Sequence, residues 1–268
     1  MPTLSSLSIY PLKSCAELPL THSTVEPLGL QHDRRWMAVR PDGSCMTGRE
    51  LPGFVHLRAV PVPEGLHLSA PGMPELAVAV PPADAPRLDI TVWSDTCSAA
   101  WAGEEADRWL SAYLREPARL VYVDARMRRP VDPKYAAPDD RVGFADGYPL
   151  LLISEASLVD LNTRLPQPVR MNRFRPNLVV SGCEPFAEDR WKRLRIGEVE
   201  LVLVKPCARC VFINVDASTA RPDPAQQPLR TLATYRNHGN KVLFGQNVIA
   251  RHGGVLRVGD PVEVLEEA

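Results

Sequence analysis

A chain of 268 residues, 45% of them hydrophobic, is long enough to bury a substantial core in one large domain or two small ones. Its net charge of −1 argues against a protein that binds nucleic-acid polymers through a basic surface. No apolar stretch approaches the roughly 18 residues of a membrane span, and the N-terminus lacks the features of a secretory signal, so we expect a cytoplasmic protein without a membrane segment.

Cysteine and proline usage indicates reduced thiols and a β-rich fold. The six cysteines are scattered over a large chain without a secretory signal, which favours reduced thiols over disulfides. With Cys207 and Cys210 as the one close pair, a four-thiolate zinc site has little support. The 27 prolines suit many short strands and turns better than a helical bundle.

The first predicted strand, residues 4–10, ends beside groups that suit an anion. Lys13 and Ser14 bring an ammonium group and a hydroxyl donor together, a combination that suits phosphate. For these residues alone, a solvated loop lysine is the simpler explanation. Arg34, before the next predicted strand, is either a second cation for the same anion or the salt-bridge partner of Asp33 or another carboxylate.

The pattern of short elements continues through the first half of the chain. Alternating runs broken by proline and glycine over residues 51–92 predict antiparallel strands. Residues 103–114 have apolar residues at helical spacing and acids in the first turn, which predicts a helix. A basic and then Pro/Asp-rich segment, residues 126–140, has the length of a lid or a linker. We place a boundary between two domains near residue 120.

The second half contains a further basic segment next to a strand. A short apolar run at residues 150–153 predicts a buried strand, and a helix is expected to follow with Ser154 or Glu155 near its N-cap. Arg175 and Asn177 belong to residues 170–177, whose arginines could hold a doubly charged phosphate through bidentate contacts. An exposed arginine-rich loop is the alternative.

The two close thiols follow a predicted strand over residues 199–204. Pro206 has no N–H for a ladder, so we expect regular pairing to end there. The basic residues beside Cys210 favour the thiolate form, which binds soft metals. We therefore predict that Cys210 ligates a metal. Cys207 either supports that ligand without contacting the metal or is only a packed thiol, and we favour the packed thiol.

Seven segments, in this order along the chain, resemble the MOSC proteins, named for the C-terminal domain of molybdenum-cofactor sulfurase, in the branch of the mitochondrial amidoxime-reducing component. The resemblance implies a mainly β fold with some helices (α+β): an N-terminal β-rich MOSC domain over residues 1–120 and a MOSC β-barrel domain over residues 121–268. The matching segments are residues 10–15, 33–36, 154–158, 173–177, 207–210 with Asp216, 243–246 and 258–262.

The resemblance also implies a molybdenum–pterin cofactor between the two domains. Cys210 matches the cysteine that ligates molybdenum, and Arg209 would stabilise its thiolate. Asp146 matches an acidic residue near the metal and is a candidate proton relay. The residues that match contacts to the cofactor phosphate and pterin are Lys13, Ser14, Arg34, Arg175 and Asn177.

The implied activity is the two-electron reduction of N-hydroxylated compounds, such as amidoximes, hydroxylamines and N-hydroxylated bases, to the parent amine or amidine. Because the cysteines lack plant-type ferredoxin spacing, we expect electrons from a separate flavin or iron–sulfur protein. Two other functions remain open at this stage. One is a sulfur carrier that uses a Cys210 persulfide, and the other is a non-catalytic carrier of the molybdenum cofactor.

Overall fold

One curled sheet of nine strands organises the computed structural model, which describes residues 1–267. Its order is β2-β1-β13-β12-β19-β15-β14-β21, with β18 paired to β19. β12 and β13 run parallel and are joined through α2 (Glu155–Thr163), whereas the other neighbours run antiparallel. The strands are β1 (Thr3–Ile9), β2 (Leu18–Leu20), β12 (Leu150–Ser154), β13 (Leu178–Ser181), β14 (Trp191–Ile196), β15 (Val199–Arg209), β18 (Asn237–His238), β19 (Lys241–Ala250) and β21 (Val262–Glu267).

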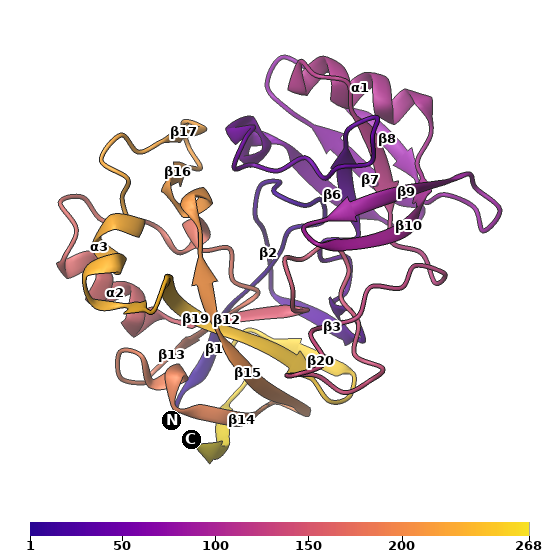
Figure 1. Cartoon of the computed structure of the whole chain (residues 1–268). Helices are drawn as coiled ribbons and strands as arrows, with labels where there is room; N and C mark the ends of the chain where they lie inside the picture. Colours follow the sequence, from indigo (N-terminus) through magenta and orange to yellow (C-terminus); the bar gives the residue numbers. More distant parts are fainter. Residues whose placement is uncertain (268) are drawn as a thin grey trace.

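The sheet closes on itself because the start of the chain pairs with the approach to its last strand. The N–H of Leu4 donates to the carbonyl of Asp260 (2.9 Å), and the N–H of Val262 donates to the carbonyl of Pro2 (2.9 Å). The two termini therefore lie together at one end of the molecule (Figure 1). Buried leucine, isoleucine and valine side chains fill the interior, which makes this part a barrel with an apolar core.

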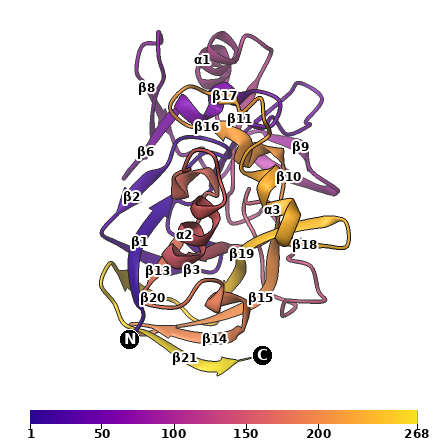
Figure 2. The same cartoon turned by 90° about the vertical axis from the view of Figure 1, so that its left-hand side faces the viewer.

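Helices α2 and α3 (Leu229–Tyr235) lie on the same side of the large sheet (Figure 2). Together with strands of that sheet they form a second apolar cluster. Leu161 of α2 and Leu232 of α3 are buried with Ile153 of β12 and Phe244 of β19. Of the two residues predicted near the N-cap of α2, Ser154 is the cap, because its side chain accepts a hydrogen bond from the N–H of Ser157.

Two smaller sheets and one helix form the other half, at the upper right of Figure 1. Trp109 and Leu110 of α1 pack into a core that also holds Phe54 and Leu66. One sheet has the order β5-β11-β10-β9 and the other β6-β7-β8. The elements are β5 (Trp36–Val39), β6 (Arg58–Val62), β7 (Gly65–Ser69), β8 (Leu76–Ala79), β9 (Arg87–Val92), β10 (Asp95–Trp101), α1 (Glu104–Leu114) and β11 (Arg119–Tyr122).

Short elements connect and decorate these two halves. β3 and β4, from the start of the chain, pair with β20 from its end. No helix among residues 1–267 has the length and apolar character needed to cross a membrane. The remaining elements are β3 (His22–Glu26), β4 (Gly29–Leu30), β16 (Val215–Asp216), β17 (Arg221–Pro222), β20 (Gly254–Arg257) and the 3-10 helices η1 (Pro52–His56), η2 (Met171–Arg173), η3 (Ala187–Asp189) and η4 (Val211–Asn214).

The fold confirms the predicted mainly β class with some helices, but pairing does not end at Pro206. β15 continues to Arg209 along β19. Its register shifts between Leu203 and Lys205 and again between Pro206 and Ala208. Such irregularities admit a residue without an N–H into a strand, and the sequence pattern gives no sign of them.

A substitution at Gly245 in β19 tests how closely the barrel strands pack. The φ of Gly245 is +80°, and a Cβ there would lie 2.6 Å from Cγ1 of Ile153 and 2.9 Å from the carbonyl oxygen of Leu152. We expect Gly245→Ala to lower the free energy of unfolding by more than about 2 kcal/mol, since strain and overlap add. Urea denaturation measures the loss.

Gly239→Ala is the matched control for this substitution. Gly239 has φ +63°, but no atom lies within 4 Å of an added Cβ, so the control keeps the backbone strain and omits the overlap. We expect a loss of about 1 kcal/mol there. Equal losses for the two variants would contradict the steric account.

Candidate functional site

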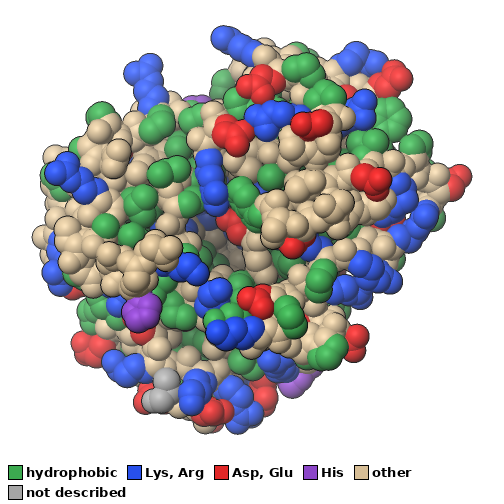
Figure 3. Space-filling model, in the orientation of Figure 1, with side chains coloured by type: hydrophobic (Ala, Val, Ile, Leu, Met, Phe, Trp, Pro, Cys, Tyr) green, Lys and Arg blue, Asp and Glu red, His purple; other side chains and the backbone are tan. Residues whose placement is uncertain are grey.

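A pocket lies between the two halves of the molecule, where lysine and arginine side chains surround the hollow in the middle of the face in Figure 3. Its walls come from the segment after β1, the turn between β9 and β10, the loop before β12, the segment before β13 and the end of β15. All eight site residues predicted from the sequence line this pocket: Lys13, Ser14, Arg34, Asp146, Arg175, Asn177, Arg209 and Cys210.

Lys13 and Asp146 form an ion pair in the pocket wall. The buried Nζ of Lys13 donates to Oδ1 of Asp146 (2.7 Å) and to the carbonyl of Phe144 (2.8 Å). Burial lowers the pKa of Lys13, and the carboxylate of Asp146 partly offsets this effect. For Asp146, the limited solvation of its carboxylate in the pocket would raise the pKa, but the charge and hydrogen bond of Lys13 lower it well below its usual range. An ionised carboxylate, 69% exposed, therefore borders the pocket.

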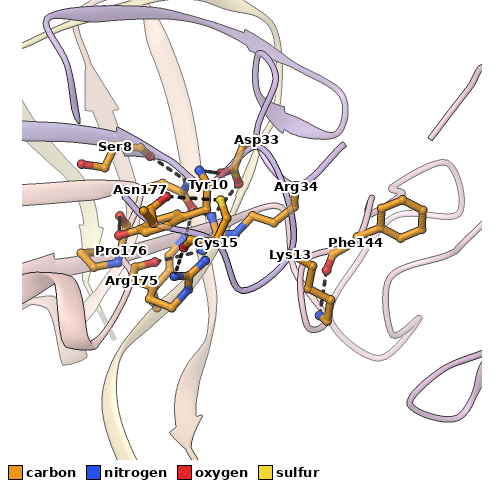
Figure 4. Close-up of polar contacts among 12 residues, drawn as sticks. Ser8, Tyr10, Lys13, Cys15, Asp33, Arg34, Phe144, Arg175, Pro176 and Asn177 are labelled. Atoms are coloured by element: carbon orange, nitrogen blue, oxygen red, sulfur yellow. Dashed lines mark hydrogen bonds and ion pairs between the residues drawn. The ribbon is translucent and has the colours of Figure 1, made fainter. Parts of the chain in front are cut away.

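Arg34 joins the segment after β1 to the segment before β13 (Figure 4). Its Nη1 donates to Oδ2 of Asp33 (2.6 Å) and to Oδ1 of Asn177 (3.1 Å), and its Nη2 donates to the carbonyl of Arg175 (3.1 Å). Oδ1 of Asp33 accepts from the N–H of Tyr10 (2.8 Å). The salt bridge and the pocket position that the sequence left as alternatives for Arg34 thus occur together.

Asn177 completes this buried network. Its Nδ2 donates to the carbonyl of Ser8 in β1 (3.1 Å), and its Oδ1 also accepts from the N–H of Leu151 in β12 (3.2 Å). Asn177 is only 1% exposed, so an unpaired amide there would be costly. The side chain therefore fixes β1 and β12 relative to the pocket.

Arg175 is partly buried between both halves, and one of its donors is free of contacts among residues 1–267. Its Nη1 donates to the carbonyl of Cys15 (2.6 Å), and its Cζ lies 4.0 Å from the ring centre of Tyr10. Burial and the nearby guanidinium of Arg34 lower the pKa of Arg175, which remains charged. Nη2 is buried without a hydrogen-bond partner in the part of the chain that the structure describes, so this cation has unused binding capacity.

Three of the predicted site residues have left-handed backbone. The φ values are 69° for Ser14, 47° for Arg34 and 58° for Arg175. Residues other than glycine rarely adopt this conformation, which costs about 1 kcal/mol or more and is concentrated at functional sites. The surrounding packing and hydrogen bonds hold the backbone in place, so the pocket side chains have fixed starting points.

The thiol end of the pocket differs from the prediction. Cys207 and Cys210 are both partly exposed and both line the pocket, so the prediction of a packed thiol at Cys207 is wrong. Nη1 of Arg209 donates to Sγ of Cys207 (3.1 Å), and its Nη2 donates to the carbonyl of Phe174 (2.6 Å). The hydrogen bond of Arg209 goes to Cys207 rather than Cys210 because residues two apart on a strand share a face.

Arg129 is a positioning residue that sequence reasoning missed. The sequence places it in the basic part of a segment with the length of a lid or a linker, yet Arg129 is only 2% exposed. Nη1 donates to the carbonyls of Gly143 (2.9 Å) and Ala145 (2.6 Å), Nη2 donates to the carbonyl of Asp146 (2.8 Å), and Nε donates to Oδ2 of Asp95 (2.8 Å). Arg129 therefore fixes the backbone that carries Asp146, and an arginine in a basic run gives no sequence signal of such a role.

The pocket lining has hydrogen-bonding capacity that the protein itself does not use. Across the described range, residues 1–267, no hydrogen-bond partner reaches the buried Nη2 of Arg175, Nε of Arg209 or Oγ1 of Thr47. Unsatisfied buried polar atoms are costly, and two of these belong to cations. The donor set therefore fits a bound group with several negatively charged oxygens.

Two family models match the chain: "MOSC N-terminal beta barrel domain" over residues 1–117 and "MOSC domain" over residues 139–263. The mouse (Mus musculus) protein named mitochondrial amidoxime-reducing component 1 is 36% identical over 280 residues, which cover 98% of this chain and 82% of that protein. The chain belongs to the MOSC proteins.

Further relatives place this MOSC protein in the branch of the amidoxime-reducing components. Component 2 of Rattus norvegicus is 38% identical, with 97% of this chain and 82% of that protein covered. Component 1 of Homo sapiens is 35% identical, with 98% of this chain and 83% of that protein covered. The similarity therefore extends through both MOSC domains and confirms the resemblance seen in the seven segments.

Asp146→Asn tests the ion pair of this MOSC protein. A carboxyl whose pKa is lower in the folded state stabilises the fold above its unfolded pKa, and the benefit is lost as pH falls toward the folded pKa. We expect the loss in free energy of unfolding to be constant above about pH 5 and to shrink below about pH 4. Urea denaturation at several pH values measures it.

Glu75→Gln is the control for the charge change itself. Glu75 is exposed and has no ion pair among the described residues, so its variant should show no comparable loss. A loss in Asp146→Asn that stays the same from pH 3 to pH 7 would contradict the ion-pair account.

Proposed function

We propose that this protein is a molybdenum-cofactor-dependent oxidoreductase that reduces N-hydroxylated compounds to the parent amine or amidine. The amidoxime-reducing components that it resembles over nearly its whole length support the reaction class. The single structural observation that supports the proposal most is the convergence of Cys210, the pocket cations and their unpaired donors on one pocket.

The residues present fit such a cofactor at both of its ends. Lys13, Arg34 and Arg175 line the pocket from both halves and suit the phosphate and oxygen atoms of the pterin. Asn177 and Ser14 add polar groups, and Cys210 supplies a soft thiol ligand. When bound, the group would supply two-electron redox chemistry at its metal.

The protein side chains would orient the substrate and control protons near the metal. Because its pKa is low, Asp146 is ionised at neutral pH and would accept a hydrogen bond from the N–OH of the substrate. Asp146 would act as a proton relay that transfers protons without remaining protonated itself. Lys13, bonded to the same carboxylate, would keep it in place.

Electrons would come from a separate flavin or iron–sulfur protein. The six cysteines are free thiols, and four of them lie outside the pocket lining. The partner would approach the pocket face shown in Figure 3.

Cys210→Ser tests the metal ligand. We expect at least a hundredfold loss of benzamidoxime reduction, measured with dithionite-reduced viologen, and a changed spectroscopic signature of the metal, because a hydroxyl is a poor substitute for a thiolate. Cys183→Ser is the matched control, since Cys183 is a free, partly exposed cysteine outside the pocket. Wild-type activity in Cys210→Ser would overturn the ligand role. Wild-type protein that carries a Cys210 persulfide and no molybdenum would favour the sulfur carrier instead.

Arg175→Ala tests the cofactor contact independently of turnover. We expect molybdenum per chain, measured by elemental analysis of protein from a cofactor-competent host, to fall several-fold, because a partly buried cation with a free donor is removed. Arg175→Lys should recover only part of it, since lysine lacks the bidentate edge. Arg193→Ala, at an exposed ion pair of β14, is the control. Unchanged occupancy in Arg175→Ala would remove Arg175 from the cofactor site.

A further inference from the structure

Arg49 and Trp93 form a stacked pair in the pocket lining. Trp93 lies in the turn between β9 and β10, and Arg49 follows β5. Cζ of Arg49 lies 4.1 Å from the ring centre of Trp93, and Nζ of Lys13 lies 5.2 Å from it. The indole ring therefore extends from the ion pair inside the pocket to an exposed guanidinium.

The backbone of Trp93 is unusual for so large a residue. Val92 pairs with Asp95, so Trp93 and Ser94 form a two-residue hairpin turn, and Trp93 has φ 58°. Glycine or asparagine is usual where such a turn needs a positive φ. The side chain is 37% exposed, so core packing does not account for a tryptophan at this position. Strained backbone that presents an exposed ring to a pocket points to a role in binding.

Two contacts hold the pair in place from other parts of the chain. Asp95, at the base of the turn, accepts a hydrogen bond from Nε of the buried Arg129 (2.8 Å). Gly48 lies against Phe212, whose ring a Cβ at Gly48 would overlap. The loop that carries Arg49 is thus fixed by the C-terminal half, and the turn that carries Trp93 is fixed by the loop before β12.

Arg49 is available to a ligand. Among residues 1–267 its guanidinium forms no ion pair and no hydrogen bond, whereas Arg34 and Arg173 in the same lining are paired with Asp33 and Asp216. Stacking on an indole ring uses the face of a guanidinium and leaves its N–H edge free for a carboxylate. The lining contains six lysine and arginine side chains and one carboxylate, so an anion is favoured there.

We propose that the Arg49–Trp93 pair binds the part of the substrate remote from the N–OH group and selects planar aromatic substrates that carry a carboxylate. The inference rests on the proposed function and specifies its substrate class. Trp93 supplies a flat apolar surface on which an aromatic ring stacks, and Arg49 supplies a bidentate contact for the carboxylate.

Reduction of three amidoximes by the loaded enzyme tests the proposal. Wild type should have a kcat/KM roughly tenfold higher for 4-carboxybenzamidoxime than for benzamidoxime, a difference of about 1.4 kcal/mol. Arg49→Ala should bring this ratio close to one, and Arg108→Ala, at an exposed arginine of α1, should leave it unchanged. Trp93→Gly relaxes the turn, so thermal stability should be kept or raised while kcat/KM falls more for benzamidoxime than for acetamidoxime.

Binding without turnover separates this inference from the proposed function. Calorimetric titration with 4-carboxybenzamide and benzamide should show tighter binding of the carboxylate by wild type and loss of that preference in Arg49→Ala. If no amidoxime is reduced but this preference is found, the subsite stands and the proposed function fails. If amidoximes are reduced without preference for the carboxylate, the subsite is wrong and the function stands. Reduced molybdenum content in Arg49→Ala would assign Arg49 to the cofactor and also overturn the subsite.

Discussion

The pocket depends on the ion pair and the hydrogen bonds that the largely buried guanidinium of Arg34 forms. The guanidinium contacts Asp33 on its own segment and the Arg175–Asn177 segment from the other half of the chain. Removal of one partner from a buried ion pair costs about 3–5 kcal/mol because the other charge stays unpaired. Both halves are therefore held in one relative position, and Lys13 and Ser14, which lie between Tyr10 and Arg34 in sequence, are held with them.

The same arrangement places several positively charged side chains in the pocket, where the stability of the fold does not require them. Arg175 and Arg209 keep buried donors without partners, and Ser14, Arg34 and Arg175 keep strained backbone. Evolution toward stability alone would remove such features, since each costs free energy. Their concentration in one pocket is the pattern of a site that becomes fully paired only when an anionic group is bound.

Sequence reasoning identified residues whose chemistry is visible in a motif. Lys13, Arg34, Arg175 and Asn177 each stand in a short segment that resembles the MOSC family, and the structure brings them to one pocket. Sequence reasoning did not identify a residue whose role depends on tertiary contacts. Arg129 differs from its basic neighbours through its burial and through its contacts with Asp95 and the carbonyls of the loop before β12.

The sequence pattern also did not predict the irregular geometry of β15 or the positive φ of Trp93. Pro206 stays within β15 because the register shifts on either side of it. The side chains of Cys207 and Arg209 meet because the strand continues past the proline. The wrong prediction of the strand end therefore also led to the wrong prediction that Arg209 contacts Cys210. The positive φ of Trp93 could not be read from residue types, since glycine or asparagine is usual there.

The position of β1 within the large sheet bears on how the chain tolerates being cut. β1 lies between β2 and β13, so the MOSC barrel includes a strand from the very start of the chain. A fragment that begins near residue 120 would leave the Leu178–Ser181 edge with open N–H and C=O groups, a template for aggregation. A single protease nick in the exposed loop at residues 132–140 leaves both pieces joined by intact β-ladders. The two domains recognised in the sequence are therefore not separate in the structure, because a strand from the first belongs to the barrel of the second.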